Sequence, residues 1–238
     1  MNIDFNYSED KVINIDCPKG VFVPNITTRL LIEAVYALNF KYSNVLDLGC
    51  GSGALGASLC KEDIINTPIF ASDLSEIAVE TSKVNFSRYG YEAIIKAGSL
   101  FEPWKGMRFD LIIDDISGIS EAVASISPWF QGIPCISGDD GSFLVNSIIN
   151  ESPDFLSPGC IILFPLLSLS NTDSILSNAR QTFKKVNLIC RKEWPLPAEM
   201  HSSMAMLKNL RDKGNIQLIE KFGMFLCYTE IYCASEPR

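Results

Sequence analysis

The stretch VLDLGCGSGALG, from Val45 to Gly56, decides the fold. An apolar run ends in an acid and then breaks into three glycines within five residues, Gly49, Gly51 and Gly53. Glycine lets the chain take positive φ and lets a ligand touch the bare backbone. The helix expected next would point free N–H groups and the positive end of its dipole at such a ligand. The stretch therefore predicts a strand, a ligand-binding loop and a helix, in that order.

Strands and helices alternate along the rest of the chain. Apolar runs predict strands at 44–49, 68–73, 92–98, 109–115, 159–165, 185–193 and 224–234. Helical spacing and capping residues predict helices at 25–38, 52–63, 75–90, within 138–156, at 173–183 and at 197–214. Such alternation indicates crossover connections and a mainly parallel sheet that is buried on both faces. We predict an α/β, doubly wound fold around a mainly parallel seven-stranded sheet.

Domain organisation follows from the same pattern. No Pro/Gly/Ser-rich linker or charge run divides the 238 residues. We expect an N-terminal cap segment and helix at 1–40, and a ligand-binding catalytic domain at 41–238 with a helical insertion near 195–215.

Composition excludes several classes of function. The net charge of −8 and the sequence pI of about 4.8 disfavour a phosphate backbone as partner. The first ten residues lack the basic and apolar parts of a signal peptide, and the longest apolar run, Cys160 to Leu169, is far short of the ~20 residues that cross a bilayer. The eight cysteines form no C-x-x-C pair, and His201 is the single histidine, so no metal site is predicted. We expect a cytoplasmic protein.

A second acid refines the ligand. Asp73 ends the second predicted strand, twenty residues beyond Gly53, where a carboxylate can reach two ribose hydroxyls. The dinucleotide fingerprint is met formally by Gly49, Gly51 and Ala54, but no phosphate-binding lysine or Walker pattern follows. The ligand predicted is one that contains adenosine.

The pattern D-x-G-x-G-x-G, which begins at Asp47, resembles the first motif of the Rossmann-like S-adenosylmethionine (SAM) methyltransferases. The resemblance implies SAM as cofactor, an antiparallel last strand and a small helical cap. It implies these cofactor-binding residues: Asp47, Gly49, Gly51, Gly53, Asp73, Leu74, Ser99, Leu100 and Asp114. Relatives often place an Asp at the position of Ser99.

From Gly20 to Pro165 the chain resembles the release-factor glutamine N5-methyltransferases more closely. GVFVPNITTRLLIEA is similar to the segment before their sheet, and SLFEPW followed by FDLII is similar to their third and fourth strands. Their fourth strand runs into N-P-P-Y, which grips the amide and stacks on it. Here the four positions read D-I-S-G, from Asp115 to Gly118. An ionised carboxylate accepts hydrogen bonds but cannot donate them, so the change favours an amine acceptor.

The catalytic candidates are Asp114 and Asp115, at the carboxyl end of the fourth strand. Like charges in one pocket raise one of the two pKa values, which suits a general base. Alternatively, Asp114 faces a helix terminus and only Asp115 meets the ligand. Trp129 and Phe130 could roof the site or simply pack a lid.

Other polar residues have simpler explanations. Asp139 and Asp140 precede a helix, which amino-terminal capping explains. His201 could accept a proton, although a surface histidine is the simpler reading.

These features favour an enzyme, a SAM-dependent methyltransferase acting on a small-molecule amine or hydroxyl in specialised metabolism, with no nucleic-acid or membrane partner. Two alternatives stay open. One is a SAM cyclase that releases methylthioadenosine and forms azetidine-2-carboxylate, because DDISGISEAVASISPWF resembles such a biosynthetic branch. The other is a SAM-binding module without catalysis.

Overall fold

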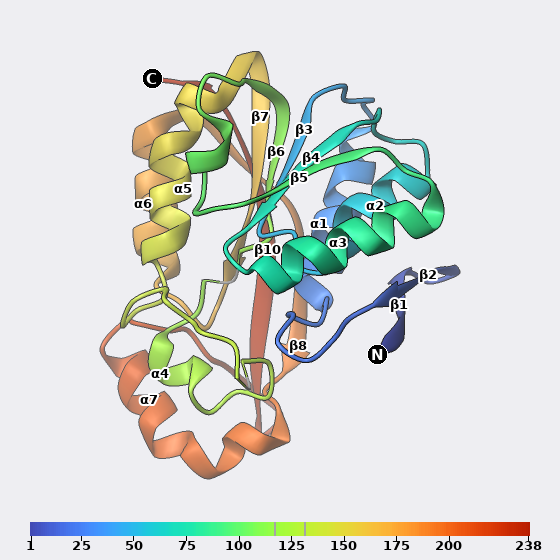
Figure 1. Cartoon of the computed structure of the whole chain (residues 1–238). Coiled ribbons are helices and arrows are strands. Elements are labelled where there is room, and N and C mark those ends of the chain that lie inside the picture. The colour runs from blue at the N-terminus through green and yellow to red at the C-terminus, as the bar shows by residue number, and fades with distance from the viewer. Residues whose placement is uncertain (117, 131) are drawn as a thin grey trace.

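A computed structural model describes residues 1–116, 118–130 and 132–238 (Figure 1). The strands are β1 (Asn2–Ser8), β2 (Lys11–Asp16), β3 (Val45–Leu48), β4 (Ile69–Asp73), β5 (Ala93–Ala97), β6 (Phe109–Asp114), β7 (Leu156–Leu167), β8 (Phe183–Pro195), β9 (Ile219–Lys221) and β10 (Met224–Pro237). The α-helices are α1 (Ile26–Leu38), α2 (Ala54–Lys61), α3 (Glu76–Tyr89), α4 (Glu121–Ala124), α5 (Phe143–Glu151), α6 (Thr172–Thr182) and α7 (Met204–Asp212). Short 3₁₀ turns are η1 (Glu102–Trp104), η2 (Ser152–Phe155) and η3 (Ala198–Ser203).

The large sheet has the strand order β5-β4-β3-β6-β7-β10-β8, and the short β9 pairs with β10. Strands β5, β4, β3, β6 and β7 run parallel to one another, while β10 runs antiparallel to both β7 and β8. Helices α1, α2 and α3 lie on one side of the sheet, and α5 and α6 lie on the other (Figure 1). The predicted doubly wound α/β fold with an antiparallel last strand is confirmed.

The central strands β3 and β6 are buried on both faces, as their apolar runs predict, whereas the edge strands β5 and β8 are largely exposed. In β3 the side chain of Val45 joins the core cluster shared with α1 and α2, whereas Leu46 and Leu48 join the cluster shared with α5 and α6. In β6 the side chain of Ile113 joins the first cluster and that of Ile112 the second. Alternation across the pleat places successive side chains in the two layers.

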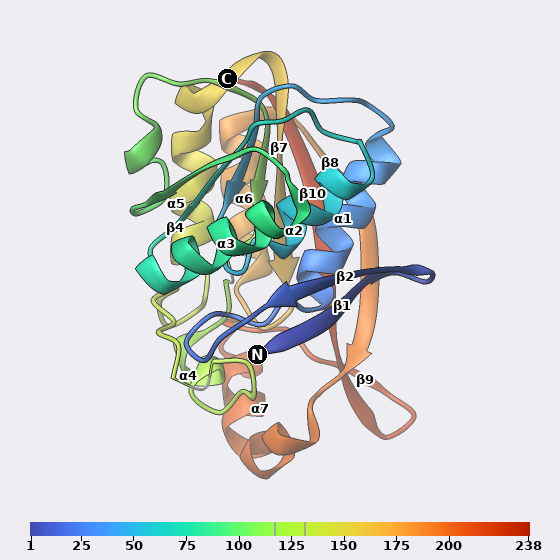
Figure 2. The same ribbon diagram turned by 45° about the vertical axis from the view of Figure 1, so that its right-hand side comes forward.

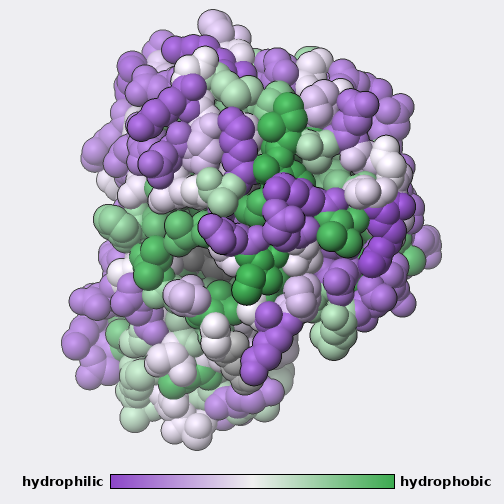
Figure 3. All heavy atoms as spheres, viewed as in Figure 1, coloured by the Kyte–Doolittle hydropathy of each residue, from purple (hydrophilic) through white to green (hydrophobic). Residues whose placement is uncertain are grey.

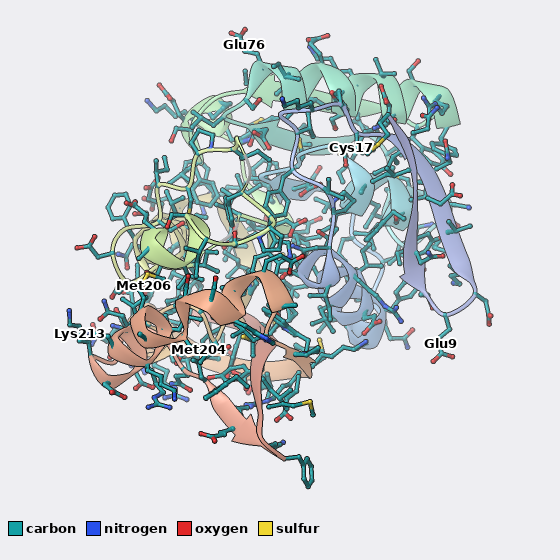
Figure 4. All side chains as sticks on the ribbon, turned by 90° about the horizontal axis from the view of Figure 1, so that it is seen from below. Glu9, Cys17, Glu76, Met204, Met206 and Lys213 are labelled. Atoms are coloured by element: carbon teal, nitrogen blue, oxygen red, sulfur yellow. The ribbon has the colours of Figure 1, made fainter. Side chains whose placement is uncertain are left out.

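The first strands form a hairpin that sequence reasoning missed. β1 and β2 pair antiparallel as a separate two-stranded sheet, with Glu9 at the turn between them (Figures 2 and 4). Phe5 and Tyr7 on one strand, and Ile13 and Ile15 on the other, are buried against the helices. Their period-two spacing was a strand signal, but the acidic and polar residues between them obscured it.

A cap covers the carboxyl ends of the parallel strands. It consists of α4, η3, α7 and the segments beside them, below the sheet in Figure 1. Met200 and Leu207 are fully buried in the cap's own core, and Met204 and Met206 pack against it (Figure 4). The helix predicted at 197–214 is therefore present, but its first part is the 3₁₀ turn η3.

Among the described residues, no helix has the length and apolar character that crossing a membrane would need.

Candidate functional site

A cavity of about 200 Å³ opens where β3, β4 and β6 end, between the sheet and the cap. The glycine loop forms one wall, and Phe130 with residues 133–137 forms part of another. Figure 3 shows hydrophobic side chains gathered around a hollow in the middle of this face. Its place at the carboxyl ends of parallel strands is where α/β sheets bind their ligands.

The three glycines of the loop differ in their surroundings: Gly49 and Gly53 have no room for a side chain, whereas Gly51 has. A Cβ on Gly49 would lie 2.5 Å from Cγ1 of Ile116, and φ at Gly49 is +77°. At Gly51 a Cβ would meet nothing nearer than the Phe22 carbonyl at 3.8 Å, so this residue opens towards the cavity. Gly53 starts α2 and packs against Ser82, behind the cavity wall.

Asp73 ties the loop to the strand beside it. Its Oδ2 accepts a hydrogen bond from the Gly51 N–H at 2.9 Å, and its Oδ1 accepts one from the Ser75 N–H at 2.8 Å. The carbonyl of Ser72 also accepts from the N–H groups of Gly49 and Cys50. Burial raises the pKa of Asp73, and the three backbone N–H groups of the loop and helix start act against that shift. The carboxyl that was expected to hold ribose therefore also shapes the loop.

Asp47 lies beneath the loop and is fully buried. Among the described residues no hydrogen bond reaches either of its oxygens, although the Gly56 N–H lies close enough to stabilise the ionised form slightly. Burial, followed by repulsion from Asp73, raises the pKa of Asp47 to about 7. Asp47 does not line the cavity.

Asp114 and Asp115, at the end of β6, point to different places. Asp114 is fully buried; its Oδ1 accepts from the Ile116 N–H at 2.9 Å and its Oδ2 has no described partner. Burial raises the pKa of Asp114 to about 8. Asp115 lines the cavity, and its Oδ2 accepts from the hydroxyl of Thr28 at 2.9 Å. Burial, with repulsion from Asp47, raises the pKa of Asp115 well above its usual range.

The wall opposite the glycine loop comes from elements that sequence reasoning did not assign to the site. Thr28 on α1 reaches Asp115, and Phe22 meets the predicted roof residue Phe130 edge to face, with ring centroids 5.3 Å apart. The V-P-N-I-T-T stretch, Val23 to Thr28, runs into α1 and belongs to the segment that resembles the release-factor enzymes. It was the sequence signal that could have assigned Thr28 to the site. Trp129 turns away from the cavity and packs against Trp194 in the cap.

The other end of the cavity is formed by the loops after β4 and β5. Leu74, Ser99 and Leu100 line it, and Leu74 is 65% exposed. Leu100 has a φ of +46°, in the left-handed region that residues other than glycine rarely adopt. The apolar side chain of Leu74 suits the flat face of a nucleic-acid base, and the hydroxyl of Ser99 suits its polar edge.

The remaining candidates lie away from the cavity. Asp140 accepts hydrogen bonds from Ser142 and Asn171 and so fixes the start of α5, while Asp139 is exposed. His201 is exposed and its ring nitrogen contacts the carbonyl of Leu196 at 3.2 Å. Ser117, the third position of the D-I-S-G stretch, lies outside the described residues.

The predicted cofactor residues thus divide into two groups. Those that line the cavity are Gly49, Gly51, Asp73, Leu74, Ser99 and Leu100. Those behind its wall are Asp47, Gly53 and Asp114. The residues present fit SAM. The loop at the end of β3 is bare, Asp73 offers a carboxyl for the ribose, and Leu74 offers an apolar surface for the base. Buried carboxyl oxygens of Asp47 and Asp114 have no described partner, and they would favour a cation in the cavity beside them.

Comparison with known proteins gives the family of this arrangement. The model of the methyltransferase small domain matches residues 13–115. The release factor glutamine methyltransferases of Clostridium acetobutylicum and Clostridium botulinum are each 30% identical to the chain, over 67% and 65% of it. The chain spans only 60% and 58% of their lengths. A Thermus thermophilus 16S rRNA methyltransferase, solved with SAM and guanosine, superimposes with a TM-score of 0.62 at 14% identity over 99% of this chain and 50% of its own.

These relatives correct the predicted acceptor. The expectation of a small-molecule substrate and no nucleic acid is wrong on this comparison. The sequence relatives are named for a glutamine in a release factor, which is a protein, and the structural neighbour is named for a ribosomal RNA. The acidic composition misled, because net charge reports on the whole surface and not on the few groups that meet an acceptor.

Proposed function

Because this chain belongs to the class I SAM-dependent methyltransferases, we propose that it transfers a methyl group from SAM to a nitrogen of a polypeptide side chain. The observation that carries the proposal is the convergence of the glycine loop, Asp73 and Asp115 on one cavity at the strand ends. The sequence relatives, named for a protein glutamine, favour a polypeptide over a nucleic acid.

The cofactor would be held by the loops after β3, β4 and β5. The carboxyl of Asp73 would accept from the ribose hydroxyls, while the open backbone at Gly51 would let the methionine end lie close to the loop. Leu74 would pack on the base, with Ser99 and Leu100 at its edge. SAM supplies a methyl carbon that its sulfonium already makes electrophilic, so the protein's main task is to hold donor and acceptor in line.

The acceptor nitrogen would enter beside Asp115. Its carboxyl, steadied by the Thr28 hydroxyl, accepts a hydrogen bond from an N–H and orients the nitrogen towards the loop. When ionised it also takes the proton that the nitrogen must lose. The Phe22–Phe130 pair lines the same cavity and would provide the aromatic surface that N-P-P-Y supplies in the resembled enzymes. The mainly apolar lining of the cavity would help to exclude water once donor and acceptor are bound.

Methyl transfer is tested with SAM that carries a labelled methyl group. The purified chain is incubated with three acceptor sets: release factor of Clostridium acetobutylicum made without its own methyltransferase, ribosomal RNA, and no acceptor. Label in the protein fraction supports the proposal. Label in the RNA fraction alone would assign the acceptor to nucleic acid.

Two further outcomes oppose methyl transfer altogether. Methylthioadenosine formed without acceptor would mean intramolecular cyclisation, and bound SAM with no product would mean a binding module.

Asp115→Ala should reduce labelling at least about hundredfold if the Asp115 carboxyl holds and deprotonates the acceptor. Asp110→Asn, at the opposite end of the same strand, serves as the matched control and should leave labelling unchanged.

A further inference from the structure

Four carboxyl groups line or back the cavity without a balancing cation among the described residues. Asp73 and Asp115 line it, and Asp47 and Asp114 lie directly behind. Within the described part of the chain, no Lys, Arg or His lines the cavity. Buried carboxyls without a cationic partner are costly, and they persist where a ligand supplies the missing charge.

Asp115 is the carboxyl best placed to meet that charge. It follows β6 directly, its N–H donates to the Leu48 carbonyl at 2.9 Å, and its backbone lies against Gly49. The Thr28 hydroxyl occupies Oδ2, and among the described residues no group donates to Oδ1. One oxygen is therefore held while the other is left for a ligand that lies along the glycine loop.

We propose that Asp115 is the counter-ion of the SAM sulfonium, and that it makes this pocket prefer the cationic donor to S-adenosylhomocysteine, the neutral thioether that methyl transfer leaves. The inference rests on the proposed function for the identity of the ligand. A charge–charge contact in a buried site is weakly screened, so loss of the sulfonium charge removes a large part of the attraction. The carboxyl would thus help to expel the product after each turnover.

Binding of the cation should also release a proton. Four groups act on the titration of Asp115: the carboxyls of Asp47, Asp114 and Asp73, and the Thr28 hydroxyl. Cys135 and Ser137 line the same cavity. Burial and the three neighbouring carboxyls raise the pKa of Asp115, and only the Thr28 hydroxyl opposes them. The empty pocket therefore keeps the carboxyl protonated at low pH, and a cation must displace that proton to bind fully.

Calorimetry tests the proposal without measuring activity. SAM, S-adenosylhomocysteine and sinefungin, which carries an ammonium in place of the sulfonium, are titrated into the purified chain at pH 6 and pH 8. Each titration is repeated in two buffers of different ionisation enthalpy. We expect SAM and sinefungin to bind about tenfold or more tighter than S-adenosylhomocysteine, with proton release only for the two cations. Their affinity should rise with pH, whereas that of the thioether should stay constant.

Two variants locate the effect. Asp115→Asn keeps the shape of the side chain but removes its charge, and should bring the three affinities to within about threefold and abolish the proton release. Ser99→Ala, at the base end of the cavity, is the matched control and should weaken all three ligands by one common factor.

The outcomes separate the two proposals. Equal affinity of the native chain for SAM and S-adenosylhomocysteine, or an unchanged preference in Asp115→Asn, would overturn the counter-ion proposal and leave the methyltransferase proposal standing. No binding of any of the three would overturn both. If Asp115→Asn does not fold, the ligand preference and proton release of the native chain still decide the question.

Discussion

At the scale of single residues, the Asp73 carboxyl shapes the glycine loop and is also proposed to bind the ribose. Substituting Asp73 removes both interactions at once. Its carboxyl holds the Gly51 and Ser75 N–H groups, and the proposed ribose contacts use the same oxygens. Asp73→Ala should weaken SAM binding by about 10- to 100-fold, since a hydrogen bond to a charged group contributes ~1.5–3 kcal/mol. Calorimetry measures the loss, and Asp212→Ala, an exposed residue at the end of α7, is the control. Unchanged affinity would remove Asp73 from the site.

Asp114 makes the stability of the empty protein depend on pH. Its pKa is about 8 in the folded chain and about 3.9 when unfolded. The folded state thus holds the proton more tightly, and its advantage is full below pH 4 and is lost as pH rises towards 8. Asp114→Asn cannot lose a proton there, so its free energy of unfolding should fall less over that range. Urea unfolding at pH 4.5 and pH 8 measures it, and parallel losses in both proteins would contradict the buried, protonated Asp114.

At the scale of elements, the glycine loop is fixed by what lies against it. Gly49→Ala would combine a positive φ with a Cβ 2.5 Å from Ile116, whereas Gly90→Ala at the end of α3 has a positive φ and no atom within 4 Å. Backbone strain alone costs roughly 1–3 kcal/mol at either site. Gly49→Ala should therefore lose more stability than Gly90→Ala and should also lose SAM binding. Chemical denaturation and calorimetry compare the two, and equal losses would mean that Ile116 gives way freely.

Some helices and strands could be predicted from the residues within them, and others could not. The helix at Glu76–Tyr89 was predicted to within a residue because Ser75 caps it and Gly90 ends it, both as local chemistry requires. The β1–β2 hairpin was missed, because acidic and polar residues obscure the period-two spacing of its apolar pairs, which pack against helices α1, α2 and α3. The aromatic pair of Phe22 and Phe130 depends on a contact across about a hundred residues, which no local pattern records.

At the scale of the whole molecule, the sequence supports the fold more firmly than the acceptor. The order of strands and helices limits the topology to few solutions, and the glycine loop marks the ligand end. The acceptor depends on a handful of side chains and on a surface that composition describes poorly. For that reason the fold and the cofactor were predicted correctly and the small-molecule partner was not.

Ligand binding should stabilise the molecule as a whole, because the cavity joins the sheet to the cap. SAM at about a hundred times its Kd should add ~2.7 kcal/mol to the free energy of unfolding if it binds only the folded chain. Thermal unfolding with and without SAM measures this, with ATP as the control ligand that shares only the adenosine. A shift as large with ATP would argue against a site for the methionine arm.

The long strand β10 has a consequence for how anything reaches that cavity. Its last part, from Thr229, lies between β7 and β8, while Leu226, Cys227 and Tyr228 continue past β7 and still pair with β8. The α7 side of the cap is therefore attached to a β10–β8 pairing that is regular from Leu226 to Ile231, and swinging it outward would break several main-chain hydrogen bonds at once. On the other side of the cavity, the described lining residues Phe130 and 133–137 lie in no helix or strand, so an opening there would break fewer main-chain hydrogen bonds.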